Sequence, residues 1–115
     1  MKTLKIRDLI KVDFAVTTED GDSVFKTLDH HFQNGEKITL DFSEIAILTT
    51  AFLNAAIGQL YSKYTSEDIS SYLKLDKISN SDLLLVKTVI QRAKEYFANK
   101  EKFEKNTGDA IYGTD

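Results

Sequence analysis

The sequence predicts an α/β domain with a mixed four-stranded sheet and about three helices packed on it. Two patterns support this fold class. Apolar residues alternate with polar ones in some segments, which is typical of strands, and recur every three or four positions in others, which is typical of helices. The predicted strands and helices follow one another in turn, an order typical of α/β folds. Neither an internal repeat nor a linker interrupts them, so we expect one domain over residues 1–98.

Residues 4–16 carry the first strand signal, because most of their even positions are apolar. Asp8 and Leu9 interrupt the alternation. The segment therefore predicts either two short strands or one strand with a bulge, and a hairpin of two strands is the preferred interpretation.

A first helix is expected to begin after Thr17 or Thr18 and to end at Gly35. A hydroxyl side chain is a common N-cap, and glycine accepts the left-handed conformation that often follows the last helical turn. Between these two signals, apolar residues recur at helical spacing, at Val24, Phe25, Leu28 and Phe32. This stripe predicts that one face of the helix packs into the core.

Residues 38–42 predict a central strand, and residues 43–49 a loop that leads into a second helix. That helix should run from about Thr50 to Tyr64, with core-facing side chains at Leu53, Ala56, Ile57, Leu60 and Tyr64. Gly58 lies within it and costs about 1 kcal/mol of helix propensity relative to alanine. We interpret this glycine as a point of close packing between the helix and the sheet.

The remaining sequence contains one ambiguous segment and one clear helix. Residues 66–76 fit both a short helix and a short strand, and a strand near residues 72–76 is the preferred interpretation. A final helix is expected after a cap at Ser79 or Ser81, with apolar side chains at Leu83, Val86, Ile90, Ala93 and Phe97. Residues 99–115 lose this spacing and predict a polar tail that is frayed or disordered.

The composition excludes several classes of function. The formal net charge is -3 and the sequence pI about 5.4, which argues against nucleic-acid binding because phosphate recognition needs a basic surface. The chain has no cysteine, so thiol catalysis, disulfides and thiolate metal sites are excluded. It has neither a signal peptide nor an apolar segment of the roughly 20 residues that a membrane helix needs. We therefore expect a soluble, cytoplasmic protein that contacts neither nucleic acid nor membrane.

No combination of residues predicts catalysis, a cofactor or a metal site. His30 and His31 are adjacent on a predicted helix, so their side chains point in different directions and do not face one metal ion. The sequence has no glycine-rich phosphate loop and no arrangement of serine, histidine and aspartate that indicates a nucleophile. Five phenylalanines are interpreted as core residues: Phe14, Phe25, Phe32, Phe42 and Phe97. We expect that the protein is not an enzyme.

The segment ITLDFSEIAILTTAFL, residues 38–53, resembles the core signature of STAS domains, the fold of sulfate-transporter domains and anti-sigma-factor antagonists. The resemblance is closest to small bacterial STAS-like proteins of unassigned function. Three pieces carry it: Gly21 near the start of the first predicted helix, LDFSEI over residues 40–45 and TTAFLN over residues 49–54. The later segment ISNSDLLLVKTVIQRA also resembles the last helix of that group. The resemblance implies a STAS-like fold.

The resemblance, which covers about residues 10–97, implies a regulatory role. In anti-sigma-factor antagonists, a serine at this turn is phosphorylated by a partner kinase of the histidine-kinase-like ATPase fold, and the added charge controls partner binding. Aligned without gaps from Leu40, that serine falls on Thr50, which is therefore the phosphorylation candidate. Thr49 replaces the preceding acidic residue of the family. Phe52 replaces a following glycine and suggests a more filled interface or pocket.

The resulting hypothesis is a non-enzymatic interaction domain, of the partner-switch type, whose partner is a histidine-kinase-like ATPase or another signalling subunit. Its binding surface would comprise Ser43, Glu44, Thr49, Thr50, Phe52, Asn54 and Gly58. Two alternatives stay open: a domain that binds a nucleotide or small ligand, and a structural subunit or homodimer. For Thr49 and Thr50, the alternative is plain capping of the helix. Asp41 is interpreted as a strand-end residue that hydrogen-bonds to nearby backbone N–H groups.

Overall fold

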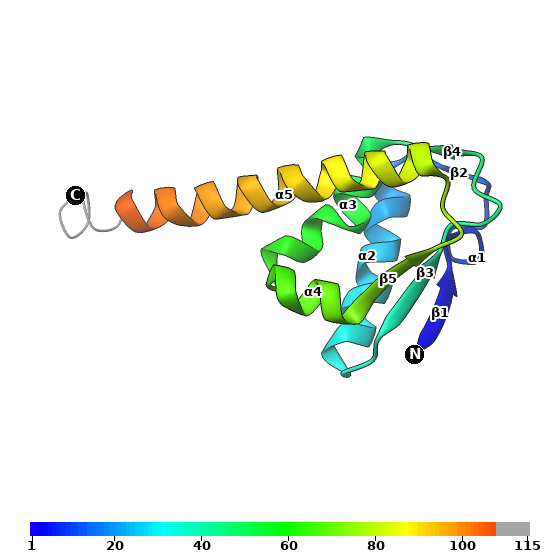
Figure 1. The fold of residues 1–115 in the computed structure, drawn as a ribbon, viewed down its shortest axis with the longest axis horizontal. Helices are drawn as coiled ribbons and strands as arrows, with labels where there is room; N and C mark the ends of the chain where they lie inside the picture. Colours follow the sequence, from blue (N-terminus) through cyan, green and yellow to red (C-terminus); the bar gives the residue numbers. More distant parts are fainter. Residues whose placement is uncertain (108–115) are drawn as a thin grey trace.

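In the part that the structure describes, the chain forms five α-helices, one 3₁₀ helix and five short strands (Figure 1). This computed structural model describes the backbone of residues 1–107 and the side chains of residues 1–98. In chain order, the elements are β1 (Lys2–Lys5), α1 (Ile6–Ile10), β2 (Phe14–Ala15), α2 (Thr18–Gln33), β3 (Ile38–Asp41), β4 (Ile47–Leu48), α3 (Thr50–Ala56), the 3₁₀ helix η1 (Gly58–Ser62), α4 (Ser66–Tyr72), β5 (Leu73–Asp76) and α5 (Asn80–Thr107).

The strands form two small parallel sheets, not the single mixed sheet that the sequence predicts. In the larger sheet, β3 lies between β1 and β5 and pairs with both in parallel. In the smaller sheet, β2 pairs with β4, also in parallel. The prediction of a mixed sheet is wrong because helices separate each strand from its partner, and a helical crossover returns the chain to the same end of the sheet.

The first fifteen residues form a strand, a helix and a second strand, so the predicted hairpin is wrong. Ile6 and Ile10 fit the alternation of a strand, but they are also four residues apart, which is the spacing of one helical face. The chain adopts the helix. α1 closes with Lys11 in the left-handed conformation (φ 66°), and Ile6 is fully buried. As a result, β1 and β2 belong to different sheets.

α2 confirms the first predicted helix. It begins after Thr17, whose hydroxyl accepts a hydrogen bond from the backbone N–H of Asp20 at 3.1 Å. Shortly after its last residue, Gly35 adopts the left-handed conformation (φ 74°). The predicted apolar stripe packs into the core, through Val24, Phe25, Leu28 and Phe32.

The second predicted helix is broken in two. α3 ends at Ala56, and after Ile57 the chain tightens into η1, which ends at Ser62. A methyl group on Gly58 would meet only side-chain atoms, the nearest at 3.7 Å, and these atoms belong to α3 and α5. Gly58 therefore does not pack closely against the sheet, as the sequence suggests. The close helix packing at a glycine occurs instead at Gly21, where α2 meets α3.

The ambiguous segment contains both a helix and a strand. α4 ends at Tyr72, and β5 follows it directly, which confirms the preferred strand. Ser79 caps α5, because its hydroxyl accepts a hydrogen bond from the N–H of Asp82 at 3.2 Å. α5 continues to Thr107, so the predicted polar tail begins inside this helix. Residues 108–115 of that tail lie outside the described residues.

The larger sheet has one apolar face and one polar face. Successive side chains of a strand point to opposite sides, and the register aligns residues of the same character across the three strands. One row across the strands consists of Leu4, Leu40 and Leu75. The next row consists of Thr3, Thr39 and Lys74. The leucine row belongs to the hydrophobic core, so the helices cover this face.

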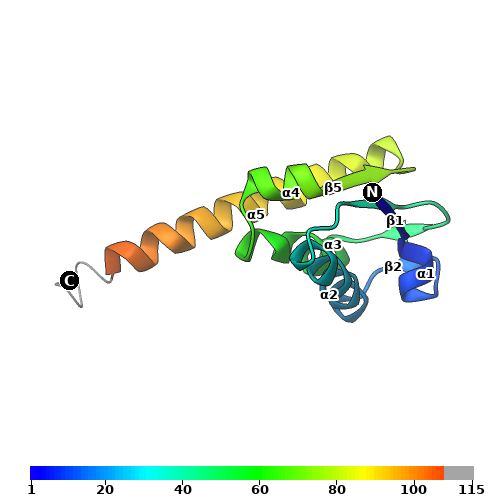
Figure 2. The same ribbon diagram turned by 90° about the horizontal axis from the view of Figure 1, so that it is seen from below.

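The helices complete the core around α3. α2 and α3 pack against each other, and α5 packs on α3 and η1 (Figures 1 and 2). α3 lies at the centre of these contacts, and most of its side chains are buried. α5 extends well beyond the rest of the fold (Figure 1). The start of α3 is thereby held in a fixed position against α2.

Candidate functional site

The loop between β3 and α3 leaves the carboxyl end of the central strand, where open parallel sheets usually carry their binding loops. Asp41 ends β3 and is buried, with 6% of its surface exposed. Its Oδ1 accepts a hydrogen bond from the backbone N–H of Ser43 at 2.7 Å. This bond confirms the interpretation of Asp41 as a strand-end residue that binds backbone N–H groups.

Charged side chains surround this strand end. Lys5 forms an ion pair with Glu44, and the Lys77 Nζ lies 3.8 Å from Oδ2 of Asp41. Hydrogen bonding from Ser43 lowers the pKa of Asp41, and the hydrogen bond from Lys5 lowers the pKa of Glu44. Both carboxyl groups are therefore ionised at neutral pH. They stabilise the loop and are not suited to donate a proton in catalysis.

Thr49 caps α3 and ties this helix to the segment around β2. Its Oγ1 accepts a hydrogen bond from the N–H of Phe52 at 3.3 Å and donates one to the carbonyl oxygen of Val16 at 2.8 Å. Its own N–H donates to the carbonyl oxygen of Ala15 at 3.1 Å. These bonds confirm helix capping for Thr49 and engage its hydroxyl within the fold.

The seven residues predicted for the binding surface divide into two groups. Thr50 and Asn54 are exposed and lie four positions apart, hence on one face of α3. Phe52 lies two positions from each, about 200° around the helix axis, and is fully buried in the core. Phe52 therefore does not lie on the surface where the sequence places it, whereas Gly58, although buried, lines an open pocket together with Asn54. The other predicted residues are exposed or half-buried: Ser43, Glu44 and Thr49.

An exposed apolar pair lies beside this junction. Phe14 of β2 and Ile47 of β4 are partners in the smaller sheet, and 47% and 57% of their surfaces are exposed. The sequence interpretation of Phe14 as a core residue is therefore wrong. Strands of two residues contain too little alternation to indicate which side faces solvent, so the sequence carries no signal for this pair. We call Phe14, Ile47 and the neighbouring Thr50 the junction surface.

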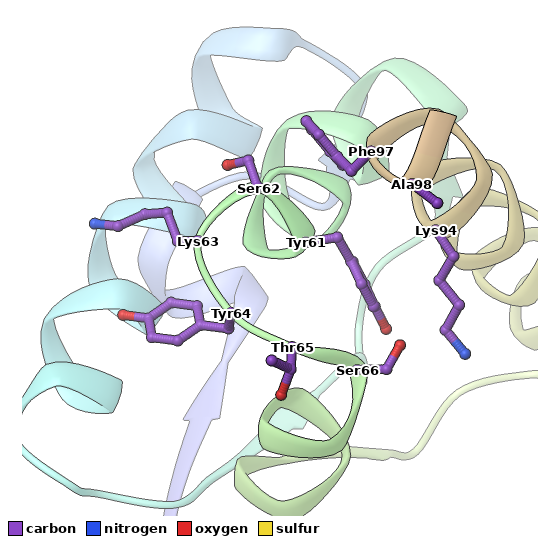
Figure 3. Close-up of a pocket in the computed structure, with 9 residues that line it drawn as sticks. All are labelled: Tyr61, Ser62, Lys63, Tyr64, Thr65, Ser66, Lys94, Phe97 and Ala98. Atoms are coloured by element: carbon purple, nitrogen blue, oxygen red, sulfur yellow. The ribbon is translucent and has the colours of Figure 1, made fainter. Parts of the chain in front are cut away.

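A shallow groove lies elsewhere, between residues 61–66 and α5 (Figure 3). Its volume is about 490 Å³, and Tyr61 and Lys94 are among its lining residues. Tyr61 points into the space between the loop and α5, whereas Tyr64 points to the other side, toward α2 (Figure 3). Burial raises the pKa of Tyr61. The lining offers hydroxyl and ammonium groups but no carboxylate or histidine.

Within the described residues, no group of three or more histidine, cysteine, aspartate or glutamate side chains is arranged to hold a metal ion. His31 instead contacts a single carboxylate, with its Nδ1 2.7 Å from Oε1 of Glu36. A membrane-spanning helix is also absent from this part of the chain, since none of its helices combines the required length and apolar character.

Residues 20–83 match the model of the family described as STAS-like domain of unknown function (DUF4325). The matched segment is more than half of the 115 residues and extends from the first turn of α2 into the first turn of α5. It includes β3, the loop after it and all of α3, and therefore Thr49 and Thr50. No curated protein and no solved structure matches the chain.

Proposed function

We propose that this chain, which belongs to the family of STAS-like domains of unknown function, is a regulatory domain that acts by binding a partner protein. The observation that supports this function best is the exposed pair of Phe14 and Ile47 beside the accessible Thr50. The junction surface is the binding site in this proposal.

Exposed apolar side chains are common when they stand alone, whereas adjacent ones are typical of interaction sites. Covering Phe14 and Ile47 would remove apolar surface from water, which contributes about 25 cal/mol per Å². β2 and β4 form a sheet of only two strands, so each has an unpaired edge within the described residues. An extended segment of a partner can add backbone hydrogen bonds at such an edge. The junction surface therefore offers two kinds of contact to the same partner.

Phosphorylation of Thr50 would control this contact. The kinase would transfer the γ-phosphoryl group of ATP to the hydroxyl oxygen, releasing ADP and a proton. The phosphate would add a charge of about −1.5 to −2 three residues from Ile47. Burying that charge against an apolar partner surface costs free energy, so the modification would weaken the contact. The hydroxyl of Thr49 is hydrogen-bonded to Val16 and Phe52, whereas Thr50 is exposed. Of the two threonines, Thr50 is therefore the one accessible to a kinase.

The partner we propose is a histidine-kinase-like ATPase, as in the anti-sigma-factor antagonists that the junction sequence resembles. The test is affinity purification of the tagged protein from cells of its source organism, followed by identification of the bound proteins. A variant carrying Phe14→Ser and Ile47→Ser should lose the partner. Leu84→Ser is the matched control, because Leu84 is a large apolar residue of α5 with 65% of its surface exposed. Equal recovery of the partner by the double variant and the wild type would contradict the proposed surface.

The phosphorylation step has its own test. Thr50→Glu places a negative charge at the switch position, and we expect it to weaken partner binding. Thr50→Ala should bind the partner normally but should take up no phosphate from ATP in the presence of the purified kinase. If both variants bind the partner as the wild type does, charge at Thr50 does not control the interaction.

The two alternatives predicted from the sequence have less support. The groove of Figure 3 has room for a nucleotide, but of the two lysines there Lys63 pairs with Asp29, at 2.8 Å. A thermal-shift screen tests this alternative, because a ligand at 100 times its Kd stabilises a protein by about 2.7 kcal/mol. Sedimentation tests the homodimer, which a monomer at high concentration would exclude.

A further inference from the structure

A small cavity away from the junction surface brings three aromatic rings and one carboxylate together. Its volume is about 170 Å³, and it is lined by Phe32, Tyr64, Asp68 and Tyr72. These residues come from the end of α2, the chain after η1, and α4. From this lining, we propose that the cavity binds an organic ammonium group, such as a quaternary or methylated amine.

The three aromatic rings that line the cavity pack edge to face. The ring centroids of Tyr64 and Tyr72 lie 5.6 Å and 5.8 Å from that of Phe32, and their planes are inclined to it by 80° and 63°. The face of an aromatic ring attracts a cation within about 6 Å of its centre, and the attraction is strongest for cations that lose little hydration. Alkylated ammonium groups meet this condition.

Tyr64 is already fixed in the position that the site requires. Its hydroxyl donates a hydrogen bond to Oδ1 of Asp29 at 2.5 Å, and the Lys63 Nζ lies 2.8 Å from Oδ2 of the same carboxylate. In Figure 3, the ring of Tyr64 is directed toward α2, the helix that carries Asp29. The ring is therefore ordered before any ligand arrives, and binding need not restrict it further.

Asp68 supplies a negative charge to the lining of the cavity. It is exposed, and among the residues whose side chains the structure describes it forms no ion pair. The nearby Lys63 is neutralised by Asp29. A cation in the cavity would therefore meet one uncompensated carboxylate, while a neutral ligand of the same shape would gain nothing from it.

The size and place of the cavity define the ligand further. A cavity of roughly 150 Å³ holds one benzene molecule, so about 170 Å³ admits a trimethylammonium group but no complete nucleotide. Phe32 lies near the end of α2, whereas the junction surface adjoins its beginning at Thr17. At 1.5 Å per residue, these two residues are about 22 Å apart along the helix. The cavity and the junction surface are thus separate sites.

The test compares a cation with its neutral isostere. Choline and 3,3-dimethylbutan-1-ol have the same shape, but only choline carries the charge. In amide-detected NMR titrations of the full chain, choline should shift the resonances of residues 64–72 saturably, and the alcohol should bind at least about tenfold more weakly. Equal affinities for choline and the alcohol would overturn the proposal.

Substitutions then locate the binding. Tyr72→Leu should weaken choline binding about tenfold, and Tyr72→Phe should retain it, because the ring face is the contact. Asp68→Asn should weaken binding up to about fivefold. Glu67→Gln is the matched control, since Glu67 is an exposed acid of α4 that does not line the cavity. An equal effect of the two acid substitutions would show non-specific attraction and contradict the site. If Tyr72→Leu fails to fold, the comparison of Asp68→Asn with Glu67→Gln still tests the site, because both side chains are exposed.

The ammonium group can belong to a small molecule or to a peptide side chain. Choline and a short peptide that contains trimethyllysine are therefore titrated in parallel. Tighter binding of one of them identifies the source, and binding of neither overturns the proposal. The outcome is independent of partner binding, because Phe14 and Ile47 do not line this cavity.

Discussion

Gly21 of α2 lies so close to Phe52 of α3 that a methyl group on Gly21 would be 2.5 Å from the carbonyl oxygen of Phe52. The same methyl group would be 2.7 Å from Cβ of Ala55. Neither neighbour is the end of a flexible side chain, so any larger residue would push the two helices apart. Phe52 lies in the first turn of α3, and the position of Thr50 therefore depends on the absence of a side chain at Gly21.

This contact predicts that Gly21→Ala destabilises the fold. Overpacking of this kind costs about 1–3 kcal/mol, which would appear as a lower midpoint of urea unfolding. Gly58→Ala is the matched control, because the nearest atom to its added methyl group is 3.7 Å away. We expect it to change the free energy of unfolding by less than about 0.5 kcal/mol, or to raise it. Similar losses in the two variants would disprove the close contact at Gly21.

The two adjacent threonines should differ in their contribution to stability. Thr49→Ala removes both the cap of α3 and the bond to the carbonyl oxygen of Val16, so we expect a loss of about 1–2 kcal/mol. Thr50→Ala removes an exposed side chain and should cost less than about 0.5 kcal/mol. Thermal unfolding of both variants measures the difference. A larger loss for Thr50→Ala would contradict the assignment of Thr49 as the cap.

Asp41 should make the stability depend on acid pH. Its pKa is lowered in the folded state, so its stabilisation is present above the unfolded pKa of about 3.9 and is lost as the pH falls through the lower folded pKa. Asp41→Asn should therefore cost about 1–2 kcal/mol at pH 7 and less at pH 3. Urea unfolding of both proteins at the two pH values tests this. An equal difference at pH 7 and pH 3 would contradict the ionised contact.

Tyr64 should make the stability depend on alkaline pH. Burial, followed by the hydrogen bond to Asp29, raises the pKa of Tyr64 to about 12. The contribution of its protonated form to stability is thus complete below pH 10 and is lost as the pH rises toward 12. An ultraviolet absorbance titration should show one tyrosine that ionises near pH 12. This step should disappear in Tyr64→Phe and persist in Tyr72→Phe; its persistence in Tyr64→Phe would contradict the assignment.

The sequence correctly predicts an element when its start signal, its apolar spacing and its end signal all indicate the same structure. α2 has a hydroxyl cap at Thr17, an apolar stripe and a glycine after its last turn, and each of these acts as expected. The strand at β3 and the capping role of Thr49 follow equally well from local residue types. These features depend on neighbours within a few positions, which a single sequence contains.

Features that depend on distant neighbours could not be predicted. Residues 6–10 fit both a strand and a helix, and burial of Ile6 in the folded core decides between them. The exposure of Phe14 depends on its pairing with Ile47, across more than 30 residues. The surroundings of Phe52 are set by Gly21 on another helix. In each case, the decisive contact joins segments that the sequence does not bring together.

The parallel pairing of all described strands has a consequence for how the chain folds. Every pair joins residues more than 30 positions apart, so no hydrogen bond of either sheet can form through a local hairpin. Long loops must close before any strand contact contributes, and high contact order slows folding. During synthesis, β1 and β2 emerge well before their partners β3 and β4. The apolar strand residues of the nascent chain stay uncovered for that interval, in which chaperones would be needed most.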